Sequence, residues 1–245
     1  MAVISSVRAS LRRLSQTFAP RHPMALVSRE IDRIESLPSS PKNRKIEVLD
    51  LGYGFGGHWG ALPAKWLAKI EIHGIDIGTD SLLPPAVGLT TLQIPHDLGE
   101  VDDNSFDLII AFDLIEHLEK HDGFRMLYHM ERICRHSAVI FTPNGILWQP
   151  PTMSNPFQAH ISSWIPAEMK SFGWKNYGTR GWKRFYGPLA QPKRGGDSLF
   201  KSWIRLVPDK IATFFPKLSF SFISVFRKDT RYLALQKLLQ EKATG

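Results

Sequence analysis

The sequence predicts an α/β protein in which a mostly parallel sheet carries helices on both faces. Short apolar runs alternate with stretches of helical periodicity along most of the chain, and elements that alternate in this way form parallel sheets. The first apolar run, 46–51, leads directly into Gly52, Gly54 and Gly56. Glycines at this place let the backbone turn sharply after a strand and approach a ligand closely. We therefore expect a ligand site at the end of the first strand.

The predicted elements follow one another in a regular order. A helical pattern at 24–37 comes first, and the Pro-Ser-Ser-Pro stretch at 38–41 ends it. Strands are then predicted at 46–51, 70–75, 91–94, 106–112, 138–142, 174–178 and 218–226, and helices at 58–68, 79–83, 122–135, 166–172 and 231–242. Parallel strands end at one edge of their sheet, where ligands bind. The loops expected at this edge are 52–57, 76–80, 95–99 and 112–118.

Composition limits the architecture and the location. With 245 residues, 43% of them hydrophobic, the chain is long enough for one well-buried domain with appendages. Its single cysteine, Cys134, excludes an intramolecular disulfide framework and fits a reducing, cytoplasmic location. No run of eighteen apolar residues occurs, so no membrane-spanning helix is expected.

The net charge of +8 is unevenly distributed along the chain. Residues 1–45 contain nine basic and three acidic residues, residues 46–145 contain six and fifteen, and residues 146–245 contain sixteen and five. Two basic flanks around an acidic centre suggest an anionic partner, which would be a phosphate-bearing substrate, a membrane surface or a nucleic acid. A solvated basic surface without such a partner is the alternative.

Residues 1–20 form a separate basic segment. They contain no acid, and their apolar residues recur at helical spacing, with Arg8, Arg12 and Arg13 elsewhere around the helix. Such an amphipathic helix could make a peripheral contact with an anionic membrane, act as a transit peptide, or pack on the domain as a lid. Residues 1–43 are therefore interpreted as a helical extension that precedes the main domain.

Acidic residues follow the first two predicted strands. Asp50 stands two residues before Gly52, and Asp76 lies twenty positions after Gly56, at the tip of the second strand. A carboxylate at this second tip can hold the hydroxyls of a ribose. The glycines also fit the G-x-G-x-x-G pattern of a dinucleotide-binding loop, so a dehydrogenase stays open. Asp50 favours a ligand with an ammonium group instead, because its charge would repel a pyrophosphate.

A third block, at 104–118, contains Asp113, Glu116 and His117 in an Asp-x-x-Glu-His-Leu segment. Together with the glycine loop, this block resembles the class I S-adenosylmethionine-dependent methyltransferases, in particular the group that carries such a segment after its fourth strand. The chain departs from this group at Tyr53, where many relatives carry cysteine.

The resemblance extends from about residue 44 to residue 228. It implies a Rossmann-like, seven-stranded and mostly parallel sheet whose last strand is antiparallel. The methyltransferase domain then covers 44–230, with a substrate-side insertion at about 146–203. A C-terminal helix covers 231–245.

The resemblance also implies S-adenosylmethionine as the cofactor. Asp50 and the glycine loop would seat its methionine end, Asp76 the ribose, and Asp97, after the third strand, the adenine amino group. For Asp97 a role in capping its own loop is the alternative. The expected cofactor contacts are Asp50, Gly52, Tyr53, Gly54, Gly56, Asp76, Ile77, Asp97, Leu98, Phe112 and Asp113.

Two histidines, His117 and His160, are candidate catalytic bases, because the ordinary pKa of histidine suits proton transfer near neutrality. His117 could instead shape the rim of the pocket. His160 lies in the aromatic, proline-rich segment 146–165, in an Asn-Pro-x-x-x-His-x-x-x-Trp order similar to that of methyltransferases acting on glycans and small molecules. Methyl transfer needs alignment more than a base, so His160 could serve binding alone. The aromatic residues around it could simply cover the edge of the sheet.

These features together predict a methyltransferase that acts on an oxygen or a nitrogen of a small-molecule or glycan-type acceptor, which the basic flanks allow to be anionic. A nucleic-acid methyltransferase is one alternative, although the segment after the fourth strand lacks the Asn-Pro-Pro-Tyr/Phe motif that resemblance would require for methylation of bases. A non-catalytic binding module that keeps the fold is another. No zinc-type Cys/His spacing and no Walker loop occur in the sequence, so no metal site is expected.

Overall fold

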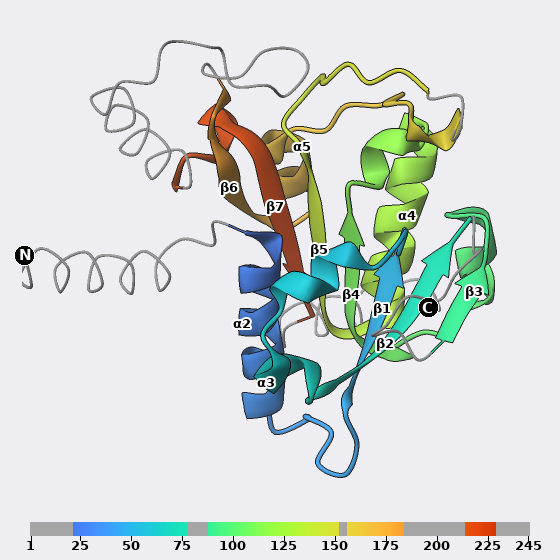
Figure 1. The fold of residues 1–245 in the computed structure, drawn as a ribbon, viewed down its shortest axis with the longest axis vertical. Coiled ribbons are helices and arrows are strands. Elements are labelled where there is room, and N and C mark those ends of the chain that lie inside the picture. The colour runs from blue at the N-terminus through green and yellow to red at the C-terminus, as the bar shows by residue number, and fades with distance from the viewer. Residues whose placement is uncertain (1–21, 78–87, 152–155, 184–213, 229–245) are drawn as a thin grey trace, which may run out of the picture.

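The computed structural model describes residues 22–77, 88–151, 156–183 and 214–228. Within them, seven strands form one sheet in the order β3-β2-β1-β4-β5-β7-β6 (Figure 1). The strands are β1 (Ile46–Leu51), β2 (Ile70–Asp76), β3 (Gly88–Thr91), β4 (Phe106–Phe112), β5 (Cys134–Pro143), β6 (Lys175–Trp182) and β7 (Ser219–Arg227). All pairs from β3 to β5 are parallel, and β7 pairs antiparallel with β5 and β6. The predicted mostly parallel sheet with an antiparallel last strand is therefore confirmed.

Most strand ends differ from the predicted bounds by a few residues, and one predicted helix is divided in two. Strands β1 and β4 have the predicted bounds, and the other strands are shifted or extended at their ends. The helix predicted at 58–68 is instead two short pieces, η1 (Gly57–Ala61) and α3 (Ala64–Leu67). Pro63 stands between them, and because it has no N–H to continue a helical ladder it starts α3 instead. The helices predicted at 1–20, 79–83 and 231–242 lie outside the described residues.

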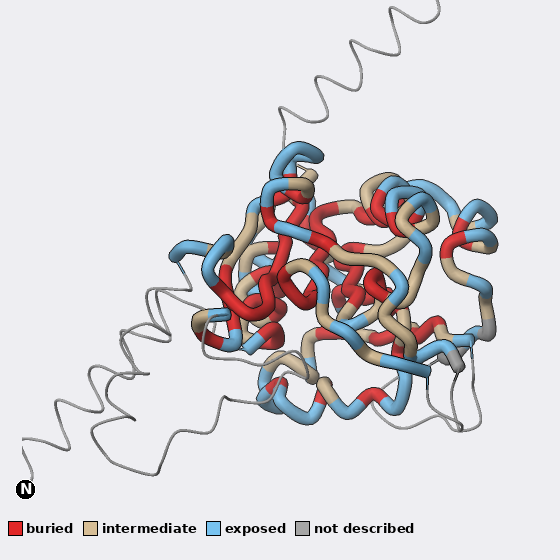
Figure 2. Tube along the Cα trace, turned by 90° about the horizontal axis from the view of Figure 1, so that it is seen from above, coloured by how far each residue is buried: buried red, intermediate tan, exposed pale blue. Residues whose placement is uncertain are grey.

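Helices cover both faces of the sheet, as expected where strands are parallel. On one face α4 (Lys120–Ile133) and α5 (Pro166–Ser171) pack in a cluster that includes Leu49, and on the other face α2 (Pro23–Ser36) packs in a cluster that includes Val48. These neighbouring strand residues belong to different clusters because successive side chains of a strand point to opposite faces. Figure 2 shows buried residues concentrated in the interior of the molecule and exposed residues around it.

Helix α2 is part of this core. Its Glu30 is fully buried and pairs with Arg33 at 2.9 Å and with Arg227, at the end of β7. A buried carboxylate needs such partners, because an unpaired one is costly to desolvate. The predicted N-terminal extension thus supplies α2 to the domain core. In the described part of the chain, no helix is both long enough and apolar enough to cross a membrane.

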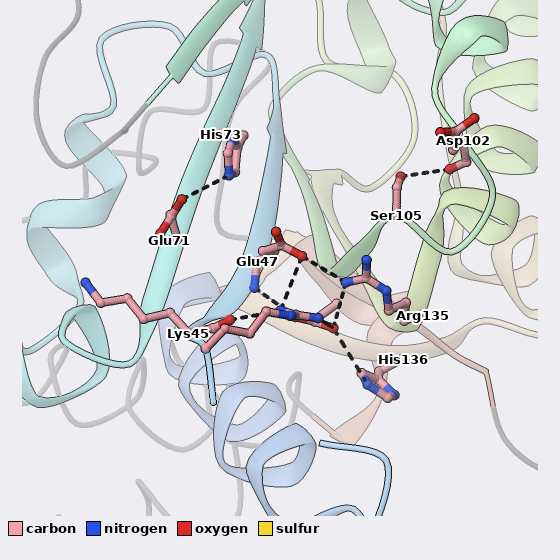
Figure 3. Close-up of polar contacts among 10 residues, drawn as sticks. Lys45, Glu47, Glu71, His73, Asp102, Ser105, Arg135 and His136 are labelled. Carbon is pink, nitrogen blue, oxygen red and sulfur yellow. Dashed lines mark hydrogen bonds and ion pairs between the residues drawn. The ribbon is translucent and has the colours of Figure 1, made fainter. Parts of the chain in front are cut away.

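An ion-pair cluster joins the amino ends of β1, β4 and β5, at the edge opposite the ligand loops (Figure 3). Asp107, at the start of β4, is 1% exposed and accepts hydrogen bonds from the Arg44 guanidinium and, at 2.9 Å, from the Glu47 N–H. Arg135 pairs with Asp107 at 3.1 Å and with Glu47 at 2.9 Å. Burial by itself would raise the pKa of Asp107, but these donors hold that pKa below its ordinary value.

We expect Asp107→Asn to lower the free energy of unfolding by about 2–4 kcal/mol at pH 7, because Arg44 and Arg135 lose a buried charged partner. The lowered pKa also fixes the pH dependence. The carboxylate's contribution is fully present above the unfolded-state pKa of about 4 and is lost as the pH falls through the lower native-state pKa. Urea denaturation at pH 7 and in acid should show the difference between wild type and variant shrinking as the pH falls.

Asp103→Asn is the matched control for this measurement. Asp103 also pairs with an arginine, Arg132, at 2.5 Å, but its side chain is 65% exposed. Exposed pairs contribute only about 0–1 kcal/mol. An effect of D107N no larger than that of D103N, or one that persists unchanged in acid, would contradict the role given to Asp107.

Gly123, in α4, makes room for Trp164. A Cβ atom added at Gly123 would lie 2.3 Å from the indole ring. Trp164 is fully buried, and its indole N–H donates to the Ser162 hydroxyl at 3.0 Å. The missing side chain at position 123 therefore lets the segment that carries Trp164 pack directly onto α4.

We expect Gly123→Ala to destabilise the protein by about 1–3 kcal/mol, because its methyl group would overlap the buried indole, even though alanine favours a helix by up to about 1 kcal/mol. Gly60→Ala is the control, since an added Cβ there meets no atom within 4 Å. Thermal unfolding of the two variants measures the difference. Equal melting temperatures would mean that the indole shifts at no cost, against the packing described.

Candidate ligand-binding site

The candidate site lies where the order of the strands reverses. Strand β1 has β2 on one side and β4 on the other, so the chain proceeds from β1 toward opposite edges of the sheet. Ligands of such sheets bind beyond the carboxyl ends of the strands, at the reversal point. The loops after β1 and β4 meet there, since a Cβ added to Gly52 would lie 3.1 Å from the Leu114 side chain. Figure 1 shows the ends of these two strands at the same edge.

The glycine loop after β1 is held against the tip of β2. Gly52, Gly54 and Gly56 have φ angles of +73°, +54° and +64°, in the left-handed region that favours glycine. The Gly54 N–H donates to Asp76 Oδ2 at 2.7 Å, and a Cβ added to Gly54 would meet no atom closer than 4.0 Å. Ile77, next to Asp76, is 47% exposed. An open backbone, a carboxylate and an exposed apolar side chain thus lie together, as expected from the sequence.

Asp50 lies beneath this loop and is fully buried. Its Oδ2 accepts a hydrogen bond from the Trp59 indole at 2.7 Å and lies 2.8 Å from His58 Nε2, whereas its Oδ1 is buried and finds no hydrogen-bond partner in the described part of the chain. Burial raises the pKa of Asp50, and His58 and Trp59 oppose that rise. His58 also makes an edge contact with Phe112, at 5.5 Å between ring centroids. Asp50 therefore anchors η1 through its Oδ2.

Three residues predicted to contact the cofactor have side chains that are buried in the core or hydrogen-bonded within their own turn. The side chains of Tyr53 and Leu98 are 1% and 0% exposed and belong to the core, so only their main chains could reach a ligand. The N–H of Leu98 already donates to the Pro95 carbonyl at 3.2 Å. Asp97 closes its own turn, because its Oδ2 accepts from the Gln93 N–H at 2.7 Å. Asp97 thus has the capping role that was its alternative assignment.

Asp113 and Arg180 place opposite charges at the ends of β4 and β6. Asp113 has φ +47°, and its N–H donates to the Phe141 carbonyl at 2.9 Å. Arg180 has φ +56° within an irregularity of β6 between Thr179 and Trp182, and such bulges re-aim side chains. Its guanidinium lies 3.8 Å from Asp113 and 4.5 Å from the centre of the Phe141 ring. Burial raises the pKa of Asp113, and Arg180 opposes the rise.

The two predicted catalytic histidines lie side by side, although they come from different segments. His117 ends the short helix η3 (Ile115–His117), and His160 lies in the loop before α5. Their ring centroids are 4.8 Å apart, with planes at 74°. Nδ1 of His117 is 3.0 Å from the Ala159 carbonyl, and Nδ1 of His160 is 2.8 Å from the Leu147 carbonyl. Burial lowers the pKa of His117, so this ring is neutral at pH 7.

Glu116 completes this group. It is 2% exposed, and its Oε2 accepts a hydrogen bond from the Thr142 hydroxyl at 2.9 Å. Its Oε1 is buried and has no hydrogen-bond partner within the described ranges. Burial, and next the charge of Asp113, raise the pKa of Glu116 to about 8. One atom able to bind a metal from each of Glu116, His117 and His160 lies within 4.8 Å of the other two.

The residues predicted from the sequence to contact the cofactor or act as bases do not include Glu116, His58 and Arg180. Each carried a weak signal: Glu116 stands in the Asp-x-x-Glu-His-Leu segment, His58 at the start of a predicted helix, and Arg180 in a basic stretch. What the sequence could not provide is their orientation. Burial of Glu116 and the irregular backbone at Arg180 arise only when β4, β5, β6 and the 159–164 segment come together.

Comparison with known proteins gives a consistent fold. No family model matches the chain. Over 113 residues the chain is 28% identical to ajmaline N-methyltransferase from Rauvolfia serpentina, and this match covers 42% of the chain and 37% of that enzyme. The chain therefore spans well under half the length of this curated relative.

Among solved structures, a SAM-dependent methyltransferase from Archaeoglobus fulgidus is similar with a TM-score of 0.51 and 19% identity, over 83% of this chain and 92% of that one. The CurJ carbon methyltransferase gives a TM-score of 0.49 at 15% identity, over 90% of this chain and 58% of that one. Identities this low concern the fold alone. The chain has the Rossmann-like fold of S-adenosylmethionine-dependent methyltransferases.

Proposed function

We propose that this protein is an S-adenosylmethionine-dependent methyltransferase that methylates an oxygen or a nitrogen of a small-molecule or glycan-type acceptor. The observation that carries the proposal is the pairing of Asp76 with the open glycine loop, at the strand-order reversal of a methyltransferase fold. A carboxylate has about four lone-pair sites, so Asp76 can bond to the Gly54 N–H and still accept ribose hydroxyls.

The surrounding residues fit the other parts of this cofactor. The unpartnered Oδ1 of Asp50 and the bare backbone of Gly54 suit the charged methionine end. The exposed Ile77 side chain suits one face of an adenine ring. The bound cofactor would supply an electrophilic methyl group on a sulfonium. The protein would then hold the acceptor atom in line with that methyl group. Such alignment lowers the activation barrier, because the entropy of bringing the two reactants together is lost on binding and not in the reaction itself.

The acceptor would bind on the side of His117 and His160. The segment at 146–165 exposes large apolar residues there, with Trp148 63% and Phe157 59% exposed, and such side chains suit rings or sugar faces. Arg180 adds a positive charge that favours an anionic acceptor. The Nδ1 contacts of both histidines turn the other edge of each ring toward the proposed acceptor side.

Several predictions about partners stay predictions. Residues 1–20, proposed for peripheral membrane contact, and 184–203, the remainder of the substrate-side insertion, lie outside the described residues. A cytoplasmic location and a choice between a small molecule and a nucleic acid as acceptor are likewise proposals. The basic flanks remain the reason to include nucleic acid in an acceptor screen.

We expect Asp76→Ala to weaken binding of S-adenosylmethionine and of its demethylated product by about 10–100-fold, because hydrogen bonds to a charged group contribute about 1.5–3 kcal/mol. Asp76→Asn should bind the cofactor with an affinity between those of the wild type and D76A, since its amide oxygen can still accept a hydrogen bond from the Gly54 N–H. Asp102→Ala, an exposed turn acid, is the control. Calorimetric titration measures the affinity of the wild type and the three variants for each ligand, and reduced nicotinamide dinucleotide is titrated separately as the alternative ligand.

Failure of the well-folded wild type to bind the sulfonium cofactor would overturn the proposal. Binding of the nicotinamide instead would identify a dehydrogenase, and binding of neither would leave a non-catalytic module. If D76A binds S-adenosylmethionine as tightly as the wild type, the cofactor assignment stands but Asp76 does not contact the cofactor.

The glycine loop offers a second test. Gly54→Ala and Gly56→Ala both force alanine into positive φ, at a cost of about 1–2 kcal/mol. Only at Gly56 would the new Cβ also lie 2.4 Å from the hydroxyl oxygen of the buried Tyr53 and 2.5 Å from its ring, which should add about 1–3 kcal/mol of destabilisation. We therefore expect G54A to be the more stable variant in urea denaturation and yet to lose cofactor binding. Wild-type affinity in G54A would mean that no ligand approaches this backbone.

A further inference from the structure

We propose that Glu116, His117 and His160 form a binding site for one divalent transition-metal ion on the acceptor side of the candidate site. The three side chains each bring an atom that can bind a metal to within 4.8 Å of the other two. Two imidazoles and one carboxylate are a ligand set used for zinc, with a fourth position left for water or substrate, and for non-haem iron(II).

The hydrogen bonds of the two histidines match those of metal ligands. In metal sites a ligating histidine donates its other ring N–H to a carboxylate or a main-chain carbonyl, which fixes the tautomer and the ring orientation. His117 Nδ1 is 3.0 Å from the Ala159 carbonyl, and His160 Nδ1 is 2.8 Å from the Leu147 carbonyl. These contacts leave Nε2 of each ring as the nitrogen for coordination, where an ion would replace the backbone hydrogen bond that His117 also makes with Asp113, and coordination requires the neutral ring.

Glu116 supplies an independent observation that points to a ligand. Its carboxyl group is 2% exposed and is held on one side by the Thr142 hydroxyl, at 2.9 Å from Oε2. The other oxygen, Oε1, is buried and receives no N–H or O–H from the described residues, and the Asp113 carboxyl lies beside the Glu116 carboxyl, to which it is hydrogen-bonded when one of the two is protonated. Buried polar atoms are nearly always hydrogen-bonded, and an exception calls for an explanation such as an absent ion. A cation bound between Oε1 and the two rings would satisfy this oxygen.

Hydrogen bonds to main-chain carbonyls hold together the two segments that carry the three proposed metal ligands. The N–H groups of Ile161 and Ser162 both donate to the Glu116 carbonyl, at 2.9 and 3.1 Å. The Ser162 hydroxyl and the Trp164 indole both donate to the Ile115 carbonyl, at 3.1 and 3.3 Å. The loop that carries His160 is thus fastened to η3, which carries the other two ligands. A site assembled before the ion arrives loses less conformational entropy on binding.

The ligand set also selects the kind of ion. Imidazole nitrogens suit zinc, copper, iron and nickel, whereas magnesium and calcium prefer oxygen ligands and waters. The site should therefore bind cobalt(II) and zinc(II) more tightly than magnesium. Three protein ligands leave coordination positions open. An acceptor hydroxyl bound at an open position would be more acidic, and this last role, unlike metal binding itself, rests on the proposed methyltransferase function.

The test uses the untagged, full-length protein after treatment with a chelator. Cobalt(II) is titrated while the visible absorption of the bound ion is followed, and zinc(II) is titrated by calorimetry. The variants are Glu116→Gln, His117→Ala and His160→Ala. His121→Ala is the matched control, because His121 stands on the neighbouring helix with its side chain 66% exposed. Circular dichroism confirms that each variant is folded.

We expect one ion per chain, with the three ligand variants at least about tenfold weaker and the control unchanged. Absence of cobalt and zinc binding in folded wild type, or ligand variants that bind like H121A, would overturn the site. S-adenosylmethionine is titrated into the same samples to separate the two proposals. Metal binding without cofactor binding supports the metal site and overturns the methyltransferase proposal. Cofactor binding without metal binding supports the methyltransferase proposal and overturns the metal site.

Discussion

The burial of a parallel sheet on both faces is the constraint on which the rest of this structure depends. Helices α2 and α4 close the two faces, so strand residues such as Leu49 and Ile110 are buried in apolar clusters. The acids of the ion-pair cluster and of the candidate site lie at the two edges where the strands end. The reversal of strand order at β1 and β4 then opens the carboxyl edge, and the ligand loops collect there.

The two edges use buried acids in different ways. At the amino edge the Asp107 carboxylate is satisfied by Arg44, Arg135 and a main-chain N–H, as expected of a group that stabilises the fold. At the carboxyl edge Asp50 and Glu116 each keep one buried oxygen without a hydrogen-bond partner in the described residues. Such oxygens cost stability and are retained where a ligand can satisfy them.

Main-chain carbonyls give this edge its rigidity. Those of Ile115 and Glu116 receive hydrogen bonds from the segment at 161–164, and Gly123 lets Trp164 of that segment sit on α4. The proposed acceptor side therefore consists of a loop that is hydrogen-bonded to the first turn after β4. A proposed site that needs side chains from two distant segments within a few ångströms depends on this fastening, because alignment is lost when the supporting residues move.

The sequence by itself determined the fold class, the strands β1 and β4 to the residue, and the meeting of Asp76 with the glycine loop, because apolar periodicity, glycine spacing and the tips of parallel strands are local signals. It singled out His117 and His160 but could not predict that their rings lie in contact. Only the tertiary structure decided that Tyr53 and Leu98 turn into the core, that Glu116 is buried with one oxygen unpartnered, and that Pro63 divides a predicted helix. Burial and side-chain direction arise from packing between segments far apart in the chain, and no local pattern of residues encodes them.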